Sequence, residues 1–510
     1  MSGRIRWSIR GLPLLLMSVL LILVSCTANQ AIPAEVSKYS QDWPLANYNY
    51  SNTRATTDSN IRSTNIKNIG TLWTLPILGV SAFGAAATNP IIAGNTAYFQ
   101  DLKNNVFAVD LAKGTILWQK LFDTVNIGPN GIAVGYGKVF ASADPYNFVA
   151  LDANNGSELW RTKVSDVNSV GTDIQPVVYD GKVYLATVPG TGYTDFYAGG
   201  GIGMIYALDQ ATGKIVWSFS TVDSADIWGN KAVNSGGGCW FPPAIDTKTN
   251  TMYWGVSNPA PFPGTTDFPN GTSRPGSNFY TDSLLSLDAK TGKLNWYTQV
   301  LSHDLFDHDL QLSPILATAS INGKKQDIIL CAGKMGIVYA FNRQTGAILW
   351  QTPVGTHQND NLNTLPADQT TTVYPGIYGG VETPMALYKD ILFVPVVNLS
   401  TDFVATAVKG VQPFTDGTGE LLAININTGK IVWDKKFNSL NLGGATVIND
   451  TVLTSTFDGT LYGYKWDTGN EVWSFKAAGG INAEPAVNKD MILVPVGMGD
   501  TPVLMALKLK

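Results

Sequence analysis

Short runs of alternating apolar and polar residues recur along most of this chain. KVYLATV (182–188) and GMIYALD (203–209) are two of them. Runs of this length, bounded by glycine and polar residues, are typical of half-buried β-strands. The pattern therefore predicts an all-β protein.

One nine-residue unit, approximately D-x-x-T-G-x-x-x-W, joins these strands in pairs. Its glycine permits the left-handed backbone of a tight hairpin, and its tryptophan lies in the second strand. An additional tryptophan, Trp73, has the strand context but lacks the turn. The seven copies are DLAKGTILW ending at Trp118, DANNGSELW at Trp160, DQATGKIVW at Trp217, DAKTGKLNW at Trp296, NRQTGAILW at Trp350, NINTGKIVW at Trp433 and KWDTGNEVW at Trp473.

The spacing of the repeats indicates the architecture. Trp118 and Trp160 are 42 positions apart and Trp433 and Trp473 are 40 apart, which suits one four-stranded blade per repeat. We therefore predict an eight-bladed β-propeller of four-stranded antiparallel blades, with the tryptophans packed between blades. The last three strands lack a tryptophan strand, so we expect the Trp73 strand to complete the final blade and remove an open sheet edge.

The start of the chain has the features of a secretion signal. Three arginines in the first ten residues precede LPLLLMSVLLILV, which is too short for a comfortable membrane span. The ending LVSC resembles a bacterial lipobox, in which Cys26 would be lipidated and anchor an exported lipoprotein facing the periplasm or cell exterior. A plain signal peptide and an uncleaved anchor are the alternatives. The predicted divisions are a signal peptide over 1–26, a polar tether over 27–41 and one propeller over 42–510.

Composition limits the partners. The 510 residues carry a net charge of −5 and contain no basic block of the kind that neutralises phosphates. Nucleic acid is therefore not expected as a partner. Export permits a disulfide between Cys239 and Cys331, and two buried free thiols are equally compatible with the sequence.

The segment HDLFDHD, from His303 to Asp309, concentrates charge in a chain that is only 14% charged. Crowded carboxylates raise one another's pKa, whereas a nearby cation keeps them ionised. This cluster therefore favours a bound metal. A solvated acidic turn and a purely structural cation site are the alternatives.

The repeats resemble those of the pyrroloquinoline quinone (PQQ) dehydrogenases, the quinoprotein alcohol dehydrogenases, over nearly the whole mature chain. Lipoprotein scaffolds of the outer-membrane assembly machinery have similar repeats. The repeats alone do not define an activity, so function depends on the site residues.

The resemblance assigns roles to three residues outside the acidic segment. In GGGCWFPPAIDTKTNTMYWGVSN it implies that Trp240 forms the floor beneath the flat quinone and that Asn258 binds the metal. In VPVVN it implies that Asn398 contacts the quinone. The alternatives are a core aromatic for Trp240, an organiser of a proline-rich turn for Asn258 and a loop cap for Asn398.

The acidic segment resembles the family's H-D-x-W-D motif, whose last aspartate is the catalytic base. That role falls on Asp307, with Phe306 in place of the usual tryptophan. In AGKMGIVYAFNRQTG, Lys334 corresponds to a cationic residue against the quinone oxygens. A lysine in an apolar strand context is otherwise unusual, because unpaired buried lysines are rare.

The sequence also departs from the family. The family's metal-binding glutamate is missing, since Ala198 or Thr191 occupies its position and Asp195 is the only acid nearby. The arginine that grips a quinone carboxylate is absent from VNIGPNGIAV, and there is no adjacent-cysteine pair. We expect Asp195 and Asp309 to rebuild the metal shell.

These features predict a PQQ-dependent dehydrogenase-like lipoprotein with calcium or a lanthanide as its metal. The substrate would be an alcohol or polyol. The chain has no C-x-x-C-H motif, so electrons would pass to a separate acceptor such as a c-type cytochrome. The alternative is a non-catalytic propeller lipoprotein that binds partner proteins or polymers.

Overall fold

The computed structural model describes residues 1–3, 31–166, 170–190 and 199–510. Within these ranges regular structure is almost entirely β-strand, as the alternating pattern predicted. The helical segments there are short: α1 (Ala34–Lys38), η1 (Ile66–Asn68), η2 (Pro269–Gly271) and η3 (Phe414–Asp416). None of the helices in this part of the chain is long and apolar enough to span a bilayer.

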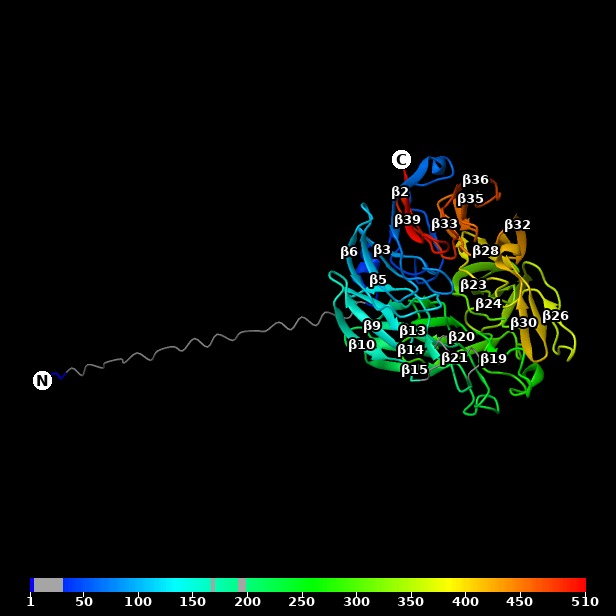
Figure 1. Cartoon of the computed structure of the whole chain (residues 1–510). Coiled ribbons are helices and arrows are strands. Elements are labelled where there is room, and N and C mark those ends of the chain that lie inside the picture. Colours follow the sequence, from blue (N-terminus) through cyan, green and yellow to red (C-terminus); the bar gives the residue numbers. More distant parts are fainter. Residues whose placement is uncertain (4–30, 167–169, 191–198) are drawn as a thin grey trace.

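Eight sheets in the described residues share one plan of four antiparallel strands, and they follow one another around a ring (Figure 1). We number the sheets in chain order. Sheets 1 to 4 contain β3 (Ile91–Ala93), β4 (Thr96–Gln100), β5 (Val106–Asp110) and β6 (Ile116–Lys120); β7 (Ala133–Gly135), β8 (Lys138–Asp144), β9 (Asn147–Asp152) and β10 (Glu158–Lys163); β12 (Val177–Tyr179), β13 (Lys182–Pro189), β14 (Met204–Asp209) and β15 (Ile215–Ser220); and β17 (Ala244–Asp246), β18 (Thr251–Gly255), β20 (Ser283–Asp288) and β21 (Leu294–Gln299).

The second half of the ring repeats the plan. Sheets 5 to 8 contain β22 (Ile315–Ile321), β23 (Lys324–Cys331), β24 (Ile337–Asn342) and β25 (Ile348–Pro353); β27 (Ala386–Tyr388), β28 (Ile391–Asn398), β31 (Thr418–Asn425) and β32 (Lys430–Phe437); β33 (Thr446–Ile448), β34 (Thr451–Ser455), β35 (Thr460–Lys465) and β36 (Glu471–Lys476); and β37 (Ala486–Asn488), β38 (Met491–Val496), β39 (Val503–Leu509) and β2 (Ile69–Pro76).

The remaining strands extend or cover this ring. β11 (Val170–Thr172) also pairs with β13, and β1 (Ala55–Thr56) pairs in parallel with β33. The smaller sheets are β16 (Ser235–Gly236) with β19 (Pro259–Ala260), and β26 (Thr371–Val373) with β29 (Thr401–Val404) and β30 (Ala407–Val411).

The tryptophan of one repeat contacts the turn of the next. Trp118 Nε1 donates a hydrogen bond to the backbone oxygen of Ala153 at 2.9 Å. Gly156, in that same turn, has φ of 72°. A Cβ added to Gly156 would lie 2.5 Å from the Trp118 ring, so the turn requires glycine both for its backbone and for the space that the indole occupies.

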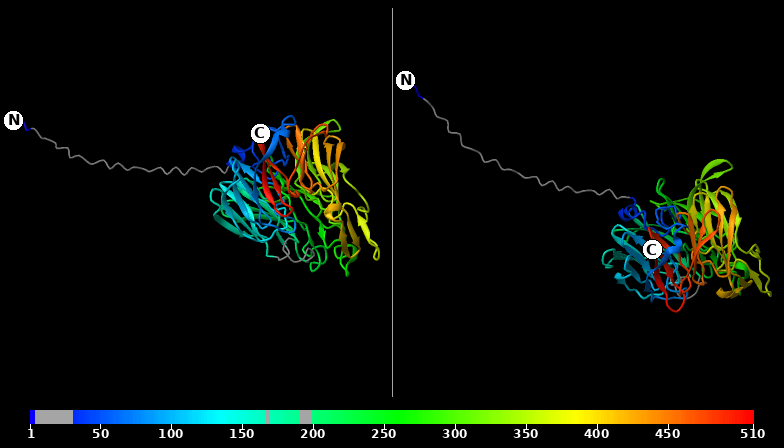
Figure 2. Two further views of the ribbon diagram at one scale, coloured as in Figure 1. Left: turned by 45° about the horizontal axis from the view of Figure 1, so that its top comes forward. Right: turned by 90° about the horizontal axis from the view of Figure 1, so that it is seen from above.

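The two ends of the chain share sheet 8, as the sequence predicted. β2 pairs antiparallel with β39, and Trp73 lies opposite Ala506. The N-terminal and C-terminal strands lie side by side in the turned views (Figure 2). Trp73 Nε1 then donates to the backbone oxygen of Leu111 in sheet 1, at 3.0 Å. The ring therefore closes through hydrogen bonds between its ends.

The segment before β2 ties the sheets together, which the strand pattern did not indicate. Arg54 in this segment is fully buried, and its guanidinium donates to the Thr446 hydroxyl in sheet 7 and to the backbone oxygens of Ala445 and Pro485, which directly precede sheets 7 and 8. Backbone hydrogen bonds to the segment come from inner strands of five sheets: Ile92 to Trp43, Ile245 to Tyr50, Leu316 to Ser51, Leu387 to Thr53 and Val447 to Arg54.

The two described cysteines are free thiols rather than a disulfide. Cys239 and Cys331 are both completely buried, in separate hydrophobic clusters. Burial raises the pKa of both thiols, so they behave as small apolar core residues.

Candidate active site

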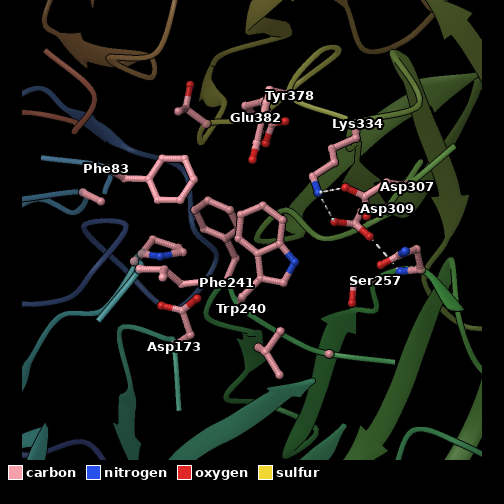
Figure 3. Close-up of a pocket in the computed structure, with 18 of the residues that line it drawn as sticks. Phe83, Asp173, Trp240, Phe241, Ser257, Asp307, Asp309, Lys334, Tyr378 and Glu382 are labelled. Atoms are coloured by element: carbon pink, nitrogen blue, oxygen red, sulfur yellow. Dashed lines mark hydrogen bonds and ion pairs between the residues drawn. The ribbon is translucent and has the colours of Figure 1, made fainter. Parts of the chain in front are cut away.

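A cavity of about 250 Å³ is lined by loops and strand ends from several sheets. Its wall is mostly apolar and includes the rings of Phe83, Trp240 and Phe241 (Figure 3). A concave, largely apolar space with a few polar groups is the usual form of a small-molecule site.

The polar side of the cavity is a buried cluster of one lysine and two aspartates. Lys334 Nζ lies 2.8 Å from Asp307 Oδ2 and 3.0 Å from Asp309 Oδ2. All three residues are at most 9% exposed. Their charges are therefore poorly screened, and their mutual positions are strongly constrained.

A local turn aims the two aspartates at the cavity. Asp304 Oδ1 accepts from the backbone N–H of Phe306 at 2.8 Å, and its Oδ2 accepts from that of His308 at 2.7 Å. Asp307 between them has φ of 64°, a left-handed conformation that is uncommon for aspartate. Such a conformation persists only where its surroundings enforce it.

The histidines of HDLFDHD hold loops and do not line the cavity. His303 Nε2 lies 3.3 Å from the backbone oxygen of Asn270, and His308 Nε2 lies 3.0 Å from that of Pro375. Asp307 and Asp309 are the members of the segment that face the cavity. The acidic segment is thus a buried part of the cavity wall and not a solvated turn.

Lys334 follows β23 and is fixed at its backbone. Its N–H donates to Gln311 Oε1 at 3.2 Å, and the Gln311 side-chain amide donates to the Val381 backbone oxygen. Lys334 Nζ lies 5.2 Å from the centre of the Trp240 ring. A cation over an indole face is favourable, so the lysine and the aromatic wall stabilise each other.

The pKa values in the cluster follow from burial and charge. Burial raises the pKa of Asp307 well above its usual range; Lys334 lowers it and Asp309 raises it further. Burial lowers the pKa of Lys334, but the charges of Asp307 and Asp309 outweigh this and hold it well above the usual value. The lysine is therefore charged, and the cluster carries more acid groups than cations.

Asn258 also lies in the cavity wall, beside the cluster. Its backbone N–H donates to Asp309 Oδ1 at 2.7 Å, and its side-chain amide donates to the Pro259 backbone oxygen at 3.1 Å. Two carboxylates and an amide are hard oxygen ligands of the kind that calcium prefers. Among the described residues, no group of three or more His, Cys, Asp or Glu side chains is arranged around a metal position.

Not every predicted site residue reaches the cavity. Asn398 ends β28, where its Oδ1 accepts from Thr356 N–H and its amide donates to Glu420 Oε1, and it is not part of the cavity lining. These contacts are the kind expected if Asn398 caps a loop, which is the alternative to a quinone contact. Asp195 and Cys26, with Thr191 and Ala198, lie outside the described residues.

Sequence reasoning missed three acids in the cavity wall: Asp173, Glu382 and Glu484. Burial raises the pKa of Asp173 and of Glu382 to about 8 in each case. Each acid lies shortly before an inner strand, at a similar place in its own repeat. Aligning the repeats with one another and comparing the residues just before each inner strand would have found these acids.

Fold and cavity together define a β-propeller with a buried lysine–aspartate cluster beside an aromatic wall. Residues 165–370 match the PQQ family model, described as "Glucose/ethanol/alcohol dehydrogenase, beta-propeller domain". Residues 396–507 match a second model, "Outer membrane protein assembly factor BamB".

Similar proteins cover almost the whole chain. The quinohemoprotein alcohol dehydrogenase of Comamonas testosteroni is 26% identical over 90% of this chain and 73% of its own length. The lanthanide-dependent methanol dehydrogenase of Methylorubrum extorquens is 24% identical over 89% of this chain and 86% of its own. The resemblance to quinoprotein alcohol dehydrogenases is therefore confirmed.

Solved structures share the fold. The crystal structure of the Comamonas testosteroni enzyme covers 92% of this chain and 80% of its own with a TM-score of 0.80 at 23% identity. A europium-containing methanol dehydrogenase gives 0.77 at 21% identity, covering 93% of this chain and 99% of its own. BamB from Moraxella catarrhalis gives 0.53 at 14%, covering 87% and 98%. At these identities the likeness shows the propeller fold alone.

Proposed function

We propose that this protein is a PQQ-dependent dehydrogenase that oxidises an alcohol or polyol. The observation that carries the proposal is the meeting of Trp240, Asp307 and Lys334, from three separate sequence segments, in one cavity. The resemblance assigns these three residues to a quinone site. The names of the relatives, quinohemoprotein alcohol dehydrogenase and lanthanide-dependent methanol dehydrogenase, support the same class of reaction.

The residues present fit a flat, acidic cofactor beside a metal. Bound PQQ would supply a quinone that accepts hydride. Trp240 offers a planar surface for stacking, and the Lys334 ammonium offers a donor to quinone oxygens. Asp307 would take the proton of the alcohol hydroxyl, and the apolar wall would exclude water from the reacting atoms.

We propose calcium or a lanthanide as the metal, with oxygens of Asn258, Asp307 and Asp309 as ligands and Asp195 as a further one. Hard cations of this kind prefer carboxylate and amide oxygens. A metal ion would also keep the crowded aspartates ionised, which the base role of Asp307 requires. Asn398 remains proposed as a quinone contact on the resemblance alone.

The finer architecture belongs to the same proposal. We propose that the eight sheets are the eight blades of one propeller over residues 42–510 and that the repeat tryptophans dock each blade on the next. We also propose that residues 1–26 form a signal peptide, that 27–41 form a tether and that Cys26 is lipidated. The protein would then face the periplasm or cell exterior and pass electrons to a separate acceptor such as a c-type cytochrome.

Reconstitution tests the proposal. Purified protein is incubated with PQQ and either calcium or a lanthanide, and dye reduction is followed with a panel of primary alcohols and polyols. Cofactor binding is followed separately through quenching of tryptophan fluorescence. Turnover with both cofactor and metal supports the enzyme, and binding without turnover on any alcohol would contradict it.

A second candidate is a non-catalytic scaffold that binds proteins or polymers. The match of residues 396–507 to the BamB model is the observation in its favour. That match covers only the last sheets, whereas the lysine–aspartate cluster lies in the part of the chain that matches the PQQ model. Failure to bind PQQ in the presence of either metal would favour the scaffold.

A further inference from the structure

Acids outnumber bases on the cavity wall. Among the lining residues that the structure describes, only Lys334 has a basic side chain, and it contacts Asp307 and Asp309. The other acids of the lining are Asp173, Glu382 and Glu484. Burial raises the pKa of Glu484, and the charge of the nearby Arg54 guanidinium offsets part of this effect.

Asp173 is the acid of this wall whose burial is not offset by a nearby positive charge. Asp173 directly follows β11 and is 3% exposed. Its Oδ1 has no hydrogen-bond partner among the described residues. Its carboxyl lies on the opposite side of the Trp240 ring from Lys334 (Figure 3). A buried polar atom without a partner is rare enough in proteins to require an explanation, and a bound ligand is one.

The protonation state of Asp173 determines what that ligand would be. Burial raises its pKa to about 8, and desolvation is the cause. At neutral pH the group is therefore a carboxylic acid, whose O–H can donate a hydrogen bond. An ionised Asp173 would repel an anion, whereas the neutral acid can bind one.

We propose that Asp173 is a cofactor-binding residue, which donates a hydrogen bond to a carboxylate of PQQ at the end of the cavity away from Lys334. This inference rests on the proposed function. It gives the cavity a binding group for each side of a flat, anionic ligand: a charged lysine on one side of Trp240 and a neutral acid on the other. It also explains how an acid-rich wall accepts an acidic cofactor.

The test measures PQQ affinity, with calcium present, by tryptophan quenching and calorimetry at pH 6.5 and pH 9.5. Wild-type affinity should fall about tenfold or more as Asp173 ionises. Asp173→Asn keeps a donor of similar shape that does not ionise. It should bind within about threefold of wild type at pH 6.5 and clearly tighter than wild type at pH 9.5. Asp173→Leu removes the donor and should bind about tenfold more weakly at pH 6.5.

Other groups facing the cavity also titrate or carry charge: Lys334, Asp307, Asp309, Tyr378, Glu382 and Glu484. They are common to wild type and Asp173→Asn, so the difference between the two pH dependences belongs to Asp173. Asp166→Asn, the same chemical change at an exposed site, is the matched control and should follow wild type at both pH values. Melting curves at each pH verify that every variant is folded.

The outcomes separate this inference from the proposed function. If folded wild type binds no PQQ at either pH, the proposed function fails. If wild type binds PQQ but Asp173→Asn shows the same loss of affinity at pH 9.5, the role of Asp173 is overturned while the function stands. Tighter wild-type binding at pH 9.5 than at pH 6.5 would mean that Asp173 acts as a carboxylate for cations, which also overturns the inference.

Discussion

The ammonium nitrogen of Lys334 lies 2.8 Å from a carboxylate oxygen of Asp307, and both side chains are almost fully buried. Breaking a buried ion pair costs more than the pair contributes, because the remaining charge is left without a partner. Substitutions here must therefore keep shape and hydrogen bonding if they are to report on chemistry rather than on folding.

Asp307→Asn meets that condition. The amide retains an oxygen for Lys334 or a metal but cannot accept a proton from the alcohol. We expect kcat to fall by about two to four orders of magnitude, the usual contribution of a general base, while PQQ affinity changes little. Dye-coupled turnover and fluorescence quenching measure the two quantities. Asp467→Asn, on an exposed repeat turn, is the control and should retain full turnover. Normal turnover in Asp307→Asn would exclude Asp307 as the base.

Asp309→Ala should fail differently. Asp309 Oδ1 accepts the Asn258 N–H and its Oδ2 contacts Lys334, so its removal deletes a hard oxygen ligand and leaves the Asn258 N–H without its acceptor. We expect metal affinity to fall at least about tenfold, with a larger loss for a lanthanide than for calcium. Metal titrations followed by quinone absorbance compare this variant with Asp307→Asn. If Asp309→Ala binds both metals as tightly as wild type, Asp309 is not a ligand.

Arg54 provides a test of the fold that is independent of the cofactor. Its guanidinium is fully buried and donates to Ala445 and Pro485 backbone oxygens and to the Asn89 side chain, among others. Burial lowers its pKa to about 10, although Glu484 raises it. Arg54→Met leaves these acceptors without their donor and Glu484 without its nearby positive charge, and should lower the free energy of unfolding by about 3–5 kcal/mol.

Arg161→Met is the matched control for Arg54→Met. Arg161 pairs with Glu158 and Asp144 on the surface, where such pairs contribute at most about 1 kcal/mol. Denaturant unfolding measures both variants. Equal, small losses would show that the N-terminal segment does not hold the sheets together.

The repeats predicted what depends on local chemistry. The turn glycines and strand tryptophans revealed the hairpins, and the missing last tryptophan strand revealed the pairing of β2 with β39. The segment around Arg54 was not predicted, because its contacts are single backbone hydrogen bonds to distant strands and leave no periodic pattern.

The site was predicted in part for a related reason. Asp307 and Asp309 were conspicuous because they are crowded in sequence. Asp173 and Glu382 are isolated acids in different repeats, and only the closure of the ring brings them to one cavity. Their raised pKa values come from burial, which no local sequence feature reports.

Asp173 also makes the stability of the cofactor-free protein depend on pH. Its pKa is about 8 in the folded state, above the value near 3.9 expected for an unfolded chain. The folded protein therefore binds a proton at Asp173 that the unfolded chain has released between these values, and the contribution of Asp173 to stability falls as pH rises from about 4 to about 8. Asp173→Asn removes this loss. The free energy of unfolding of this variant should match that of wild type near pH 4 and exceed it by several kcal/mol at pH 8.5, with no further gain at higher pH. Denaturant unfolding without PQQ or metal measures this difference.

Asp166→Asn should show no such trend, since Asp166 is exposed. A difference between Asp173→Asn and wild type that is the same at pH 4.5 and pH 8.5 would mean that Asp173 does not titrate in this range, and that it meets the cavity as an ionised group.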